Sequence, residues 1–152
     1  MSQLTKTRAS EILRNLRGRY VLVLGDVMLD EFVWGDVTRI SPEAPVPVVD
    51  VLRESVHLGG AANVLANLVA LGAQVSLISV TGADDAGNEL RAKLETAGVN
   101  IDGVLVSDKI QTTTKVRILA GHSHSSKQQV IRIDYDGEWL RTHFPRVDAV
   151  IL

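Results

Sequence analysis

The chain has 152 residues, 45% of them apolar, which is enough for one domain with a substantial core. Its 16 basic and 18 acidic residues give a net charge of −2, and only 4% of the residues are aromatic. This composition disfavours nucleic-acid binding, and no stretch has the pattern of a membrane span. Because cysteine is absent and the first residues lack a signal-peptide pattern, we expect a soluble, cytoplasmic protein without disulfides or thiolate metal sites.

The chain is expected to begin with an amphipathic helix over residues 4–16 and a buried parallel strand over residues 20–24. Asp26 and Asp30 follow this strand, where the carboxyl edge of a parallel sheet would lie. Carboxylates at such an edge accept hydrogen bonds from sugar hydroxyls or hold a metal. The alternative is a helix cap plus a solvated acid.

The next segment interrupts the alternation of strands and helices. Residues 31–37 and 46–56 resemble two strands separated by the proline-rich stretch RISPEAP. Prolines keep these strands out of the middle of a sheet. Because residues 46–56 carry apolar groups on both faces, we expect a small lid covered on both sides. A plain edge hairpin is the alternative.

The stretch GGAANVLANLVALG, residues 59–72, predicts a mostly apolar helix packed on the sheet. Gly59 and Gly60 precede it without a Ser, Thr or Asp cap, which would leave the first N–H groups accessible to a ligand. Asn63 lies in the first turn and offers both a donor and an acceptor. The structural alternative is a tight turn before a buried helix, with Asn63 as a local cap.

Residues 73–80 and 101–106 are expected to be further strands, with a helix over residues 85–97 between them. Asp84 and Asp85 stand at the start of this helix, where carboxylates cap N–H groups and favour the positive end of the helix dipole. We assign both a structural role rather than a catalytic one.

Residues 112–120 and 130–135 alternate like the two strands of a hairpin. Lys115 and Arg117 would share one face of the first strand, and Arg132 would lie on the second. Three cations facing a cleft would suit a phosphate, whereas cations facing solvent need no special role.

His122 and His124 lie in a Gly/Ser-rich tip, which favours a flexible loop over a metal site because no third ligand is nearby. Residues 138–143 predict a short helix, and residues 147–152 predict the start of another buried strand. The expected architecture is therefore a parallel α/β sheet that these residues leave unfinished.

Several motifs resemble those of the ribokinase-like (PfkB) carbohydrate kinases. The segments GDVMLDEFVWGDVTRISPEAPVPVV, GGAANV, TTTKVRIL and QQVIRID are most similar to the bacterial D-glycero-β-D-manno-heptose-7-phosphate kinases. The resemblance spans about residues 20–152. It implies a ribokinase-like α/β fold with a mainly parallel sheet, flanking helices and a small β lid, incomplete at its C-terminal end. Residues 1–152 would be the N-terminal half of one kinase domain.

The resemblance also implies roles for individual residues. Asp26, Asp30, Gly59, Gly60 and Asn63 match family positions at the sugar, where glycine would leave room for the ligand. Our own inference adds Lys115, Arg117 and Arg132 as contacts to the substrate phosphate. The lid strands imply a homodimer formed through the lids.

The implied reaction transfers the γ-phosphoryl group of ATP to O1 of the heptose 7-phosphate. The DTxGAGD motif that carries the family's catalytic aspartate does not occur in these residues, so no catalytic residue and no metal ligand are assigned. ATP and Mg²⁺ are expected to bind mainly through residues outside this stretch, which alone would be inactive. The alternatives are a kinase of another sugar or sugar phosphate, and a non-catalytic sugar-binding or dimerisation module.

Overall fold

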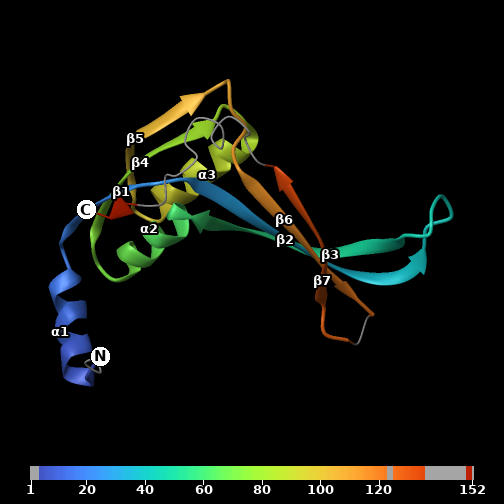
Figure 1. Cartoon of the computed structure of the whole chain (residues 1–152), viewed down its shortest axis with the longest axis horizontal. Helices are drawn as coiled ribbons and strands as arrows, with labels where there is room; N and C mark the ends of the chain where they lie inside the picture. Colours follow the sequence, from blue (N-terminus) through green and yellow to red (C-terminus); the bar gives the residue numbers. More distant parts are fainter. Residues whose placement is uncertain (1–3, 123–124, 136–149, 152) are drawn as a thin grey trace.

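A computed structural model describes residues 4–122, 125–135 and 150–151. It contains two four-stranded sheets, with strand orders β5-β4-β1-β8 and β3-β2-β6-β7. Figure 1 shows the first sheet with the helices at one end of the molecule, while the second projects from it as a long twisted ribbon. We call the first the body sheet and the second the lid sheet.

The elements follow one another in this order: α1 (Lys6–Leu16), β1 (Tyr20–Leu24), β2 (Val27–Ile40), β3 (Pro47–Gly60), α2 (Ala61–Ala70), β4 (Gln74–Gly82), α3 (Asp85–Thr96), β5 (Asn100–Ser107), β6 (Thr114–Gly121), β7 (Gln128–Tyr135) and β8 (Val150–Ile151). Each strand and helix expected within the described residues is present, with boundaries shifted by a few residues. The helix expected at residues 138–143 and His124 lie outside the described residues.

The body sheet is parallel where β1 pairs with β4 and β4 pairs with β5. This confirms the expected parallel α/β arrangement for these three strands. β8 pairs antiparallel with β1, so the body sheet is mainly rather than wholly parallel.

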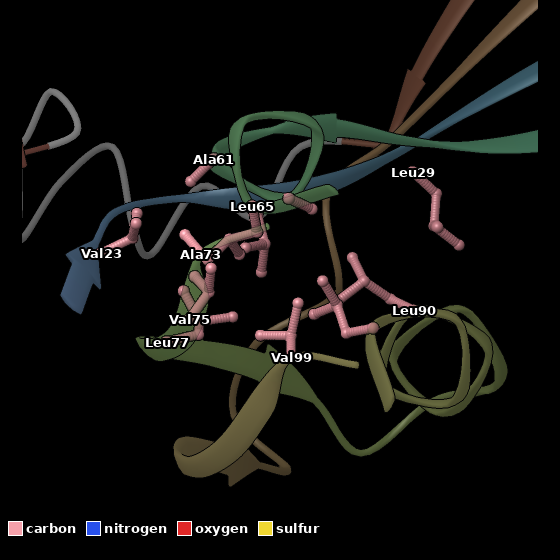
Figure 2. Close-up of a cluster of buried hydrophobic side chains, with 12 residues drawn as sticks. Val23, Leu29, Ala61, Leu65, Ala73, Val75, Leu77, Leu90 and Val99 are labelled. Atoms are coloured by element: carbon pink, nitrogen blue, oxygen red, sulfur yellow. The ribbon is translucent and has the colours of Figure 1, made fainter. Parts of the chain in front are cut away.

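The core lies between the body sheet, α2 and α3, and it extends to the base of the lid through Leu29 (Figure 2). Leu65 of α2 and Leu90 and Leu94 of α3 are completely buried, as the apolar spacing of α3 predicted. α2 packs on the sheet, as its apolar sequence predicted. Only Ala61, Ala62 and Leu65 are buried, because one side of the helix packs against the sheet.

The lid is larger than the two strands expected from sequence. β2 and β3 are each 14 residues long and pair antiparallel from Val27 and Gly60 outward. β6 joins the other edge of β2 in parallel, and β7 pairs antiparallel with β6. The predicted hairpin is therefore present, but it belongs to the lid sheet, so a plain two-stranded edge hairpin was the wrong alternative.

α1 carries its polar and apolar residues at the surface and contains no buried residue, although Leu16 packs against the core. Gly18 follows it with a φ of 70°, as expected of a glycine that ends a helix. Among the described residues, no helix is long and apolar enough to cross a membrane.

Candidate functional site

One face of the lid sheet gathers most of the residues singled out from sequence. Successive side chains of a strand point to opposite faces, so Asp30 and Phe32 share a face of β2. Their partners on β6 are Lys115 and Arg117, and cross-strand partners lie on the same face. We call this surface the polar lid face.

Asp30 and Arg117 form the central contact of this face. An Arg117 guanidinium nitrogen lies 2.5 Å from Asp30 Oδ1, and about three quarters of each side chain is buried. The Arg117 guanidinium also lies 5.3 Å from the ring centroid of Phe32, a favourable cation–π arrangement. The residue predicted to bind a sugar and one predicted to bind its phosphate are therefore in direct contact.

The other two predicted cations extend the cluster onto β7. Arg132 lies directly opposite Arg117, and Asp134 lies opposite Lys115. Asp134 contacts both cations, with nitrogen–oxygen distances of 2.8 Å to Arg132 and 3.7 Å to Lys115. Lys115, Arg117 and Arg132 thus share one face with Asp30, and each contacts a carboxylate.

Gly59 and Gly60 have a structural reason that differs from the one the resemblance implied. A Cβ on Gly59 would lie 2.6 Å from Asp30 Oδ2 and 2.8 Å from Met28 Cγ. Gly60 has a φ of 57°, and its Cβ would lie 2.8 Å from the carbonyl oxygen of Asp26. Glycine is required here because β2 and its side chains approach the end of β3 closely.

Asp26 and Asn63 lie at the base of the lid rather than within the cluster around Arg117. The backbone carbonyl of Asp26 accepts a hydrogen bond from the N–H of Ala61, at 2.9 Å. The expectation that all the first N–H groups of α2 are accessible was therefore wrong for Ala61. Asn63 is exposed in the first turn and accepts hydrogen bonds from the side chain of Asn67. A ligand contact by Asp26 or Asn63 stays a prediction.

A row of rings beside Asp30 was missed at the sequence level. Phe32 stacks on Trp34 with ring centroids 5.6 Å apart, and the edge of His57 meets Phe32 at 5.5 Å. Arg53 lies 3.9 Å above Trp34. Because side chains alternate along a strand, the sequence could have placed Phe32 and Trp34 on the same face as Asp30. The positions of His57 and Arg53 on this face follow only from the pairing of β3 with β2.

Asp84 has the structural role expected of it. It caps α3 by accepting a hydrogen bond from the N–H of Gly87, and it also accepts two hydrogen bonds from Thr112. Partial burial opposes ionisation of the carboxyl, but these hydrogen bonds outweigh it and hold the pKa of Asp84 below its ordinary value. The cap thereby ties the start of α3 to the segment that leads into β6.

On the opposite face of β2, Glu31 lies in a less favourable environment. Burial raises the pKa of Glu31, and the nearby carboxylates of Glu89 and Glu54 raise it further.

Within the described ranges, no group of three or more His, Asp or Glu side chains that could hold a metal ion is found.

The comparison with protein families matches residues 19–140 to the pfkB family carbohydrate kinases. The chain belongs to this family. Bifunctional protein HldE from Pelobacter propionicus is 48% identical to this pfkB-family chain over 123 residues, covering 81% of the chain and 24% of that protein. The same-named protein from Citrifermentans bemidjiense is 51% identical over 113 residues, covering 74% of this chain and 22% of that protein. The chain thus spans about a quarter of the length of these relatives.

Solved structures of a carbohydrate kinase and a ribokinase show the same fold. A carbohydrate kinase from Agrobacterium tumefaciens is 24% identical, with a TM-score of 0.58 over 77% of this chain and 35% of that one. Ribokinase from Cryptococcus neoformans, solved in complex with ADP, is 24% identical, with a TM-score of 0.52 over 78% of this chain and 34% of that one. The ribokinase-like fold expected from the motifs is therefore confirmed.

Proposed function

We propose that this chain forms the sugar-binding part of a kinase that transfers the γ-phosphoryl group of ATP to O1 of D-glycero-β-D-manno-heptose 7-phosphate, in the synthesis of ADP-heptose for lipopolysaccharide. The observation that carries the proposal is the polar lid face, which combines two partly buried carboxylates, Asp30 and Asp134, with three cations. A sugar phosphate has the matching chemistry, with hydroxyls at one end and an anion at the other. The family membership and the heptose-kinase motifs support the same substrate.

In this proposal, Asp30 accepts hydrogen bonds from sugar hydroxyls, and Asn63 provides a donor and an acceptor at the start of α2. Lys115, Arg117 and Arg132 neutralise the substrate phosphate. Positioning the sugar hydroxyl removes part of the entropic barrier to phosphoryl transfer, whereas stabilising the transferred group needs further charges. ATP and Mg²⁺ are proposed to bind mainly through residues outside this chain, and no step is assigned to them here.

The test measures ADP release by the full-length protein with heptose 7-phosphate and with a panel of other sugars and sugar phosphates. We expect the highest kcat/KM with heptose 7-phosphate. Asp30→Ala and Asn63→Ala should each lower it about tenfold to a hundredfold, because one hydrogen bond to a charged or polar ligand group is lost. Asp102→Ala, an exposed carboxylate on β5, is the matched control. Turnover restricted to another sugar would refute the heptose assignment.

We also propose that the full-length protein is a homodimer formed through the lid sheets. Ile40, Val46, Val51 and Leu52 at the outer end of the lid are all more than half exposed. Val51 and Leu52 lie on the edge strand β3, where an exposed apolar surface favours association. The double variant Val48→Lys/Val51→Lys places a charge on each face of β3 and should give a monomer. Size exclusion with light scattering decides this, and a monomeric wild type or a dimeric variant would contradict the proposal.

A further inference from the structure

Arg117 forms an ion pair with Asp30, the carboxylate that the proposed function assigns to the sugar. Its guanidinium lies 2.5 Å from Asp30 Oδ1, and the two side chains are only 23% and 24% exposed. Breaking a partly buried ion pair without replacing one partner is costly because a charge is then left uncompensated. A neutral sugar that donates its hydroxyl hydrogen bonds to Asp30 would displace Arg117 and leave the guanidinium uncompensated.

The neighbours of Arg117 make this cost larger. Arg132 lies directly opposite Arg117 on β7, and like charges in directly opposed positions of a sheet repel one another. In this structure each guanidinium is compensated by a different carboxylate, Arg117 by Asp30 and Arg132 by Asp134. When Asp30 turns to a ligand, Arg117 needs another anion.

A phosphorylated sugar brings that anion with it. Its hydroxyls replace the guanidinium at Asp30, while its phosphate provides the oxygen pair to which a guanidinium binds most favourably. The exchange keeps both Asp30 and Arg117 compensated, and Arg132 and Lys115 lie beside the position that the phosphate would take. The unphosphorylated sugar cannot complete this exchange.

We propose that Arg117 sets the preference of this site for a phosphorylated over an unphosphorylated sugar, by pairing with Asp30 in the free protein and with the phosphate in the complex. This inference rests on the proposed function. It predicts that Arg117 favours binding of the sugar phosphate but not of the neutral sugar. Removing it weakens binding of the sugar phosphate, and it does not weaken binding of the neutral sugar because no ion pair has to be broken.

The experiment compares the wild type and Arg117→Gln of the full-length protein by isothermal titration calorimetry, with heptose 7-phosphate and free heptose as the two ligands. We expect heptose 7-phosphate to bind about tenfold to a hundredfold more weakly to the variant. Free heptose should bind equally well or better. The ratio of the two affinities therefore falls by at least about tenfold.

Arg53→Gln is the matched control, since it removes one arginine from β3 beside Trp34. Arg53 pairs with Trp34, four residues from Asp30 along β2 and thus about 13 Å away at ~3.3 Å per residue. The Arg53→Gln variant should therefore leave the ratio of the two affinities unchanged. Arg117→Lys, which keeps the charge but not the two-pronged guanidinium, should give an intermediate ratio and serves if Arg117→Gln does not fold.

The possible failures are distinguishable. If the wild type binds neither ligand, the proposed function is wrong and the inference falls with it. If the wild type binds heptose 7-phosphate but the Arg117 variants weaken both ligands by the same factor, the function stands and the inference is overturned. An equal loss of preference in Arg53→Gln would also overturn it, because the effect would then follow net charge rather than the contact with Asp30.

Discussion

Replacing Asp84 by alanine tests what holds α3 to the rest of the domain. The carboxylate accepts hydrogen bonds from the N–H of Gly87 at 2.7 Å, and from the N–H and hydroxyl of Thr112 at 2.8 and 2.7 Å. Loss of a helix N-cap costs about 0.5–2 kcal/mol, and a hydrogen bond to a charged group contributes about 1.5–3 kcal/mol. Because the three hydrogen bonds share one carboxylate, their contributions do not simply add, and we expect a total loss of about 2–4 kcal/mol rather than the full sum.

The assay is urea unfolding of the full-length protein and its variants, followed by circular dichroism, with the free-energy change taken from the shift in midpoint. Asp85→Ala is the control, because Asp85 is the exposed neighbour in the first turn of α3. It should cost only about 0.3–1 kcal/mol through the helix dipole. A loss for Asp84→Ala no larger than that for Asp85→Ala would refute the role assigned to these hydrogen bonds.

The same carboxylate gives a pH dependence of defined sign. The pKa of Asp84 is lower in the folded chain than in the unfolded chain, so the unfolded state binds the proton more readily. The stabilisation is therefore complete above the ordinary aspartate pKa of about 3.9 and is lost as the pH falls through the lower folded value. The difference in stability between wild type and Asp84→Asn should shrink in this acid range. A difference that stays constant there would contradict the reasoning.

Two further variants test the lid. Gly59→Ala places a Cβ 2.6 Å from Asp30 Oδ2, so it should displace that carboxylate and lower kcat/KM for the sugar phosphate about tenfold or more, while unchanged kinetics would contradict this contact. Glu31→Gln should raise the melting temperature near neutral pH but not below the ordinary glutamate range, because the raised pKa of Glu31 means that ionisation destabilises the folded state as pH rises. A melting-temperature gain of equal size at all pH values would count against that explanation.

The sequence determined the local elements because their signals depend on neighbouring residues. The apolar run over residues 20–24, the apolar spacing of Leu90 and Leu94, and the capping position of Asp84 each predicted the element observed. Gly18 and Gly98 both have positive φ just after helices, where glycine is favoured. The family motifs also predicted the ribokinase-like fold. They did so by resemblance to proteins whose whole fold is known, whereas short-range patterns indicate only single elements.

The tertiary structure decided which of these elements meet. Arg117 contacts Asp30 across 87 positions of sequence, and Thr112 contacts Asp84 across 28. The first contact follows from the parallel pairing of β6 with β2. The second joins the N-cap of α3 to the segment that precedes β6. Side-chain alternation fixes which residues share a face of one strand, but it leaves open which strand lies alongside. The cations of the β6–β7 hairpin therefore acquire their place beside Asp30 only when the two halves of the lid sheet pair.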